Sequence, residues 1–136
     1  MRKQIVIEIP ASIPRILTPN RSRVAHWGQI TRAKNEFQHT AFYAAVDAKN
    51  KWLIEHPYSL LPFEKGLLWF ELVIRDKRSI MDDDNAIAGL KAVRDILQAD
   101  RAGIIANDRD FQTARLTWTV DKARAPLIIL TVEKGD

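Results

Sequence analysis

The sequence predicts a single α+β domain, a two-layer sandwich in which two helices pack on a mixed four-stranded sheet. Two stretches carry apolar residues at three- and four-residue steps, as amphipathic helices do. Four short segments rich in Ile, Val and aromatic residues either alternate or form apolar runs, as strands do. Because helix stripes and strand faces both need burial, two packed layers are the natural arrangement. The expected order is β-α-β-α-β-β over residues 1–136, one domain with its own core.

Composition excludes several classes of protein. There is no apolar run near 18 residues, so no membrane span is expected. The N-terminal apolar run is cut short by Glu8 and Pro10, which argues against a signal peptide and favours a cytoplasmic protein. The chain has no cysteine, so any metal must be bound by oxygen or imidazole ligands.

The first half of the chain predicts one strand and one long helix. Residues 4–9 alternate and are rich in Ile and Val, which indicates a strand. Prolines then argue against regular structure through Asn20. A helix is expected to begin between Ser22 and Trp27 and to end near Glu55, and Trp27 fits its apolar stripe as a core residue. The stripe consists of Ile30, Ala33, Phe37, Ala41, Ala44, Ala48 and Trp52.

The second half predicts three strands and a second helix. Residues 67–74 form an apolar run that indicates a buried strand. Residues 85–98 carry a helical stripe, preceded by aspartates that suit a helix start. Residues 112–120 alternate, and residues 127–132 form a last apolar run. Both segments are therefore predicted as strands.

Asp82, Asp83 and Asp84 are the most unusual feature of the sequence. Two like charges about 4 Å apart repel by roughly 4 kcal/mol at an effective dielectric of about 20, so something must offset the repulsion. Hard cations such as Mg²⁺ prefer carboxylate oxygens, and Asp108, on a later segment, could close such a site with Asp82 and Asp84. The alternative is a helix cap favoured by the helix dipole. One aspartate suffices for a cap, so three in a row favour the metal site slightly.

Lys91 lies on the same predicted polar stripe as Asp84 and Asp95. A lysine there could supply positive charge to a phosphate that gains negative charge during hydrolysis. The alternative is an ordinary i,i+4 ion pair between Lys91 and Asp95, worth about 0.3 kcal/mol. Spacing alone favours this ordinary pair.

Basic residues flank the acidic stretch. The formal net charge is +4, and residues 1–34 carry seven lysines and arginines against Glu8 alone. Such a surface suits a polyanionic partner, although it could also serve solubility. The residues expected to contact DNA are Arg15, Arg21, Arg23, His26, Arg75, Lys77 and Arg78.

Several motifs together resemble the RusA family of Holliday junction resolvases, which are common in bacteriophages and prophages. The resemblance covers about residues 6–132. It rests on the D-x-D-N pattern at the start of a helix, a lysine and an aspartate within that helix, and a Gly-led segment that ends in an acidic pair. The residues that carry it are Asp82-Asp83-Asp84-Asn85, Lys91, Asp95, Leu97, Gly103 and Asn107-Asp108, with Leu17-Thr18-Pro19-Asn20 and His26-Trp27 nearer the N-terminus.

The resemblance implies a homodimeric, Mg²⁺-dependent endonuclease of the bacterial cytoplasm, with Mn²⁺ as a substitute. Such an enzyme resolves four-way DNA junctions by paired symmetric nicks in recombination and repair. The family's metal ligands correspond to Asp82, Asp84 and Asp108, and its catalytic lysine to Lys91. Asp83, at the variable position of the motif, is expected to be dispensable.

The chain departs from the family pattern at two positions. The catalytic lysine of some members falls at Ala88 here, and the acidic pair begins with Asn107. Positions 88 and 91 lie about 60° apart around a helix, so a lysine at either could reach one site. Two other functions remain open. One is a DNA-junction-binding protein with an impaired nuclease site, and the other is a metal-dependent phosphohydrolase that acts on small substrates.

Overall fold

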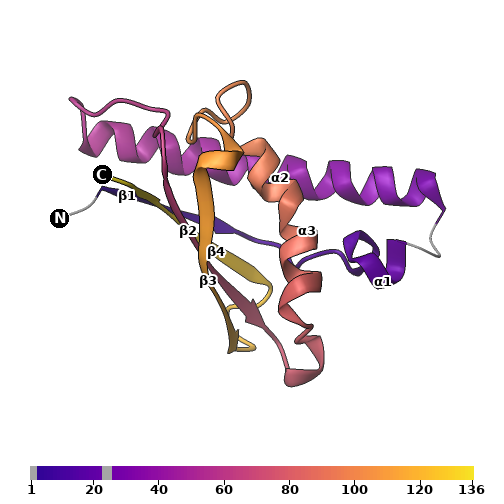
Figure 1. Cartoon of the computed structure of the whole chain (residues 1–136). Helices are drawn as coiled ribbons and strands as arrows, with labels where there is room; N and C mark the ends of the chain where they lie inside the picture. Colours follow the sequence, from indigo (N-terminus) through magenta and orange to yellow (C-terminus); the bar gives the residue numbers. More distant parts are fainter. Residues whose placement is uncertain (1–2, 23–25) are drawn as a thin grey trace.

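The computed structural model describes residues 3–22 and 26–136, and its centre is a mixed sheet of four strands (Figure 1). The strands are β1 (Gln4–Ile9), β2 (Gly66–Ile74), β3 (Phe111–Val120) and β4 (Leu127–Lys134). Their order across the sheet is β1-β4-β2-β3. Strand β4 is antiparallel to both of its neighbours, whereas β2 and β3 are parallel.

Two long helices, α2 (Trp27–Glu55) and α3 (Asp83–Ile96), complete the fold. The predicted α+β class, with two helices and a mixed four-stranded sheet, is confirmed. The structure adds a short helix and three 3-10 turns: α1 (Pro19–Ser22), η1 (Arg15–Leu17), η2 (Lys77–Ser79) and η3 (Asp108–Asp110). The prediction of irregular structure through Asn20 is wrong at α1, because proline is tolerated in the first turn of a helix.

Both helices bury side chains against one face of the sheet. Alternate residues of β1 are buried while those between them are exposed, as a half-buried strand requires. Within α2, Ala41 and Ala45 are fully buried, and their small side chains let the helix lie close to its neighbours. The same core includes Ile5, Ile7, Ile9, Phe37, Trp52, Leu68, Phe70, Leu90, Val93, Ile96, Leu130 and Val132.

Two tryptophans lie outside the core. Trp27 is 77% exposed, so its predicted place in the core is wrong. The first turns of α2 carry few buried residues, because the helix extends past the sheet at that end (Figure 1). Trp69 lies on the uncovered face, and its Nε1 donates to Glu133 Oε2 at 2.8 Å.

The segment β2–α3–β3 determines where the predicted site residues lie. Because β2 and β3 are parallel, α3 must carry the chain from the end of β2 back to the sheet edge where β2 began (Figure 1). Residues that follow β2 and residues that precede β3 therefore lie at opposite ends of the strands.

In the described part of the chain, no helix is long and apolar enough to cross a bilayer.

Candidate functional site

The three aspartates form the exposed beginning of α3. Asp82 is the N-cap residue, with an extended backbone, and its carbonyl oxygen accepts the first helical hydrogen bond from Ala86 at 3.0 Å. Its carboxylate makes no capping hydrogen bond to the backbone, but accepts one from Asn85 Nδ2 at 3.2 Å. Asp83 and Asp84 lie in the first turn, where the helix dipole favours negative charge. Solvent and the helix N-terminus thus offset part of the repulsion among the three carboxylates.

Asp82 and Asp84 match in number the carboxylates that commonly bind Mg²⁺ in proteins. Magnesium is commonly bound by one or two carboxylates, with water and substrate phosphate as the remaining ligands. Both carboxylates are exposed, and neither is engaged by a cation among the described residues. Over residues 3–22 and 26–136, however, no three His, Asp or Glu side chains gather closely enough to hold an ion. Among the described residues, the exposed carboxylates at the beginning of α3 therefore gain no third ligand of these types.

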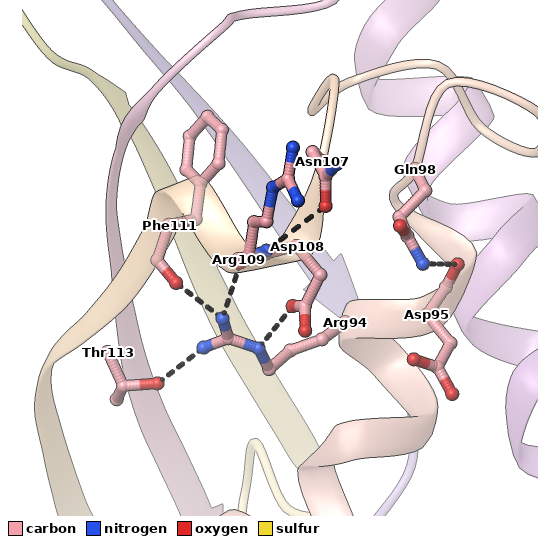
Figure 2. A network of polar contacts seen from close by, with 8 residues as sticks. All are labelled: Arg94, Asp95, Gln98, Asn107, Asp108, Arg109, Phe111 and Thr113. Carbon is pink, nitrogen blue, oxygen red and sulfur yellow. Dashed lines mark hydrogen bonds and ion pairs between the residues drawn. The ribbon is translucent and has the colours of Figure 1, made fainter.

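Asp108 binds a largely buried arginine instead of joining that site (Figure 2). Nε of Arg94 donates to Asp108 Oδ1 at 2.6 Å, and Nη1 donates to Thr113 Oγ1 at 2.9 Å. Nη2 donates to the carbonyl oxygens of Asp108, at 3.1 Å, and of Phe111. The Arg94 side chain is 15% exposed and that of Asp108 34% exposed. This cluster ties the last turn of α3 to η3 and the beginning of β3.

Helix geometry separates Asp108 from the other two predicted ligands. An α-helix rises about 1.5 Å per residue, so Asp82 and Arg94 lie about 18 Å apart along α3. Since Arg94 holds Asp108, the carboxylate of Asp108 lies near the far end of the same helix. The structure thus places Asp82 and Asp84 at one exposed helix start and does not bring Asp108 to them within one chain.

Lys91 lies on the exposed face of α3, seven residues or about 10 Å beyond Asp84. The ion pair with Asp95 that the spacing suggested is not formed, and Lys91 makes no ion pair with any described residue. Its ammonium group therefore remains available to an external anion on the helix face that begins at Asp84.

Two of the predicted basic segments meet near the beginning of α3. Nη2 of Arg15, in η1, donates to the carbonyl oxygen of Arg78, in η2, at 3.3 Å. Asp76 caps η2, because its Oδ1 accepts from the Arg78 backbone N–H at 2.8 Å. That hydrogen bond, with support from the Arg78 side chain, lowers the pKa of Asp76 below its usual value of 3.8. Arg75 and Lys77 are exposed beside them, a few residues before Asp82.

The remaining predicted DNA contacts lie on α1 and at the beginning of α2. Arg21 is exposed on α1. His26 is exposed, but its Nδ1 accepts a hydrogen bond from the Gly28 backbone N–H at 3.1 Å, so the ring caps α2. Arg23 lies outside the described residues.

Sequence reasoning did not identify Arg94 as the partner of Asp108. An arginine in the last turn of a helix, ahead of a segment with acidic residues, was the available signal. Spacing along the chain did not show that the helix would bring these two groups together.

No protein-family model matches the chain, and no curated protein matches it.

Proposed function

We propose that this chain is a Mg²⁺-dependent endonuclease that cuts four-way DNA junctions by paired nicks. The observation that carries the proposal is the pair of exposed carboxylates, Asp82 and Asp84, beside the joined basic segments η1 and η2. A carboxylate pair suits a hard cation, and guanidinium groups suit phosphates. The likeness of the D-x-D-N, lysine and Gly-led segments to the RusA family supports the same function.

In this proposal each charged group has one task. Asp82 and Asp84 hold Mg²⁺, which when bound polarises the scissile phosphate and activates water. Lys91 supplies positive charge where the phosphate becomes more negative. Arg15, Arg75, Lys77 and Arg78 bind strand phosphates, so affinity for DNA should fall steeply with salt. Arg21 and His26 extend the same surface toward α2.

We further propose that the active species is a homodimer, because paired nicks in a symmetric junction need two active sites. A dimer also bears on Asp108. If Asp108 ligates the same ion as Asp82 and Asp84, as the resemblance implies, a second copy of the chain must supply it. Arg94 would then have to release Asp108.

Mixing two inactive variants tests that arrangement. Asp84→Asn and Asp108→Asn, mixed in equal amounts and allowed to exchange subunits, form about half heterodimers, each with one intact site, if the ligands come from different chains. About one quarter of the wild-type nicking rate then returns. No recovery means that the two residues do not share a site across chains.

Cleavage of a synthetic four-way junction in Mg²⁺ tests the proposed function itself. Asp84→Asn should lose at least about 100-fold in rate, since removing a metal ligand sacrifices several kcal/mol of transition-state stabilisation. Asp83→Asn is the matched control, because it removes the same charge from the same exposed turn and should keep most activity. Equal cleavage by the wild type and Asp84→Asn would show that the metal site is assigned wrongly.

A second candidate is a junction-binding protein that does not cut DNA. The observation in its favour is the engagement of Asp108 by Arg94, together with Asn107 in place of an acidic residue. Tight, salt-sensitive junction binding without nicks in either Mg²⁺ or Mn²⁺ would establish this function instead.

A further inference from the structure

A cavity of about 500 Å³ opens at the edge of the sheet where β2 ends. Its floor is a row of three paired residues, Ile128 of β4, Leu72 of β2 and Trp118 of β3. Residues 11–15 form one wall and the connection between β3 and β4 another. Ile13 is buried in the first wall and packs against Gly89 of α3, so the wall is held by core contacts. The volume lies in the range of small-ligand sites, about 300–1,000 Å³.

The charged side chains that line this cavity are all arginines. Arg15 and Arg75 lie at it, together with the hydroxyl-bearing residues Ser12 and Ser79, and none of the described lining residues is acidic. The rest of the lining is largely aliphatic or aromatic. A ligand with a flat or apolar body and an anionic group has the complementary chemistry.

The floor also carries an unused hydrogen-bond donor. The Nε1 atom of Trp118 is buried, and no atom of the described residues accepts its hydrogen bond. Buried N–H groups are normally paired, so such a group needs an explanation. Because this atom is buried, a ligand in the cavity can accept its hydrogen bond only after the indole turns toward the cavity.

We propose that this cavity receives one unstacked nucleobase of the DNA strand, with the neighbouring phosphates on Arg15 and Arg75. The base packs on the apolar floor, and the Trp118 indole turns so that its Nε1 donates a hydrogen bond to the base. The inference rests on the proposed function and extends it, because it names a subsite that reads a base. Met81 lines the cavity and directly precedes Asp82, so the base belongs to a nucleotide near the cut phosphate.

The position of the cavity favours a DNA strand over a free nucleotide. Arg15 is hydrogen-bonded to the backbone of Arg78, so the arginines at the cavity continue into the exposed basic residues of η2. A single phosphate cannot occupy that whole row of cations, whereas a strand can. Unstacking a base costs least where its pairing or stacking is already disturbed.

The test measures junction binding in EDTA, where no cleavage occurs, by fluorescence anisotropy. A series of junctions carries one abasic residue at each position around the crossover in turn. For the unaltered protein, one position should lower affinity by about tenfold when its base is missing, as expected for loss of one bound base. If every abasic junction binds as well as the intact one, or if no junction binds, the inference is overturned.

Two tryptophan variants assign the effect to the cavity. Trp118→Phe keeps an aromatic ring and removes the donor, so the difference between intact and abasic junctions should shrink to below about threefold. Trp69→Phe is the matched control, because Trp69 lies on the uncovered face with its N–H bonded to Glu133, and it should leave the difference unchanged. Equal effects of the two variants would overturn the inference. The abasic series on the unaltered protein decides the question even if Trp118→Phe does not fold.

A free nucleotide is distinguished by titrating thymidine monophosphate into the same protein. Binding of the mononucleotide without any abasic effect in junctions would reassign the cavity to a free ligand and overturn the proposal. The two proposals also fail separately. An abasic effect in a protein that never nicks junctions refutes the nuclease and leaves the base subsite, whereas nicking without an abasic effect refutes the subsite alone.

Discussion

Replacing Arg94 by methionine should destabilise the protein, because four polar contacts of a largely buried guanidinium are lost together. Removing one partner of a buried ion pair costs about 3–5 kcal/mol, mainly because the other charge stays buried. Asp108 is 34% exposed, so solvent screens part of its charge and the lower value applies. We expect the free energy of unfolding to fall by about 3 kcal/mol. For a chain of 136 residues this corresponds to a decrease in Tm of about 10 °C.

Thermal and urea unfolding, followed by circular dichroism without metal, measure this loss. The control is Arg78→Met, since the Arg78 side chain is 93% exposed and its removal should change unfolding little. Adding Asp108→Asn to Arg94→Met should recover part of the loss, because the amide carries no unpaired charge. If Arg94→Met unfolds like the wild type, Arg94 does not hold Asp108 in solution.

Three further results follow from the described contacts. Gly89→Ala should destabilise the protein by about 1–3 kcal/mol although alanine favours helices, because its Cβ would clash with Ile13 Cγ2. Gly28→Ala in α2 is the comparison and should cost less, because its Cβ would lie 3.3 Å from His26 Nδ1, a milder contact. Lys91→Met should slow junction cleavage by about 100-fold, measured by single-turnover kinetics, with little change in junction affinity, measured by fluorescence anisotropy. An unchanged cleavage rate would show that Lys91 takes no part in the reaction. Asp76→Ala should lower Tm at neutral pH, because a carboxyl whose pKa is lowered by folding stabilises the folded state above pH 3.8 and loses that effect as the pH falls through its folded-state pKa. The wild type and Asp76→Ala should therefore have the same Tm in strong acid. A difference in Tm that persists there would contradict the role of the charge.

Local periodicity predicted the elements, because burial of one face leaves a direct pattern in the sequence. The alternation in Gln4–Ile9 reflects a strand with one covered face, and the structure has β1 over those residues. Periodicity does not report how far the facing layer extends. Trp27 continues the apolar stripe of α2 but lies beyond the part of the helix that packs on the sheet, and it is exposed.

The site was predictable only where its residues are neighbours in the chain. Asp82 and Asp84 share the exposed beginning of α3 because they are only two residues apart in the chain. The relation of Asp108 to them depends on whether β3 runs parallel or antiparallel to β2, which the sequence pattern does not specify. Parallel pairing places Asp108 beside Arg94, at the end of the strands opposite to Asp82 and Asp84. The cavity beside Trp118 likewise depends on three strands and a loop that are distant in sequence.

The central claim is that Asp82 and Asp84 form the metal site of a nuclease. The most direct measurement is a crystal structure of the protein soaked in Mn²⁺, with the ion located by its anomalous signal. We predict a peak about 2.1 Å from carboxylate oxygens of both Asp82 and Asp84 at the beginning of α3. A fully soaked crystal with no ion at these two carboxylates, or with ions only elsewhere, would contradict the claim.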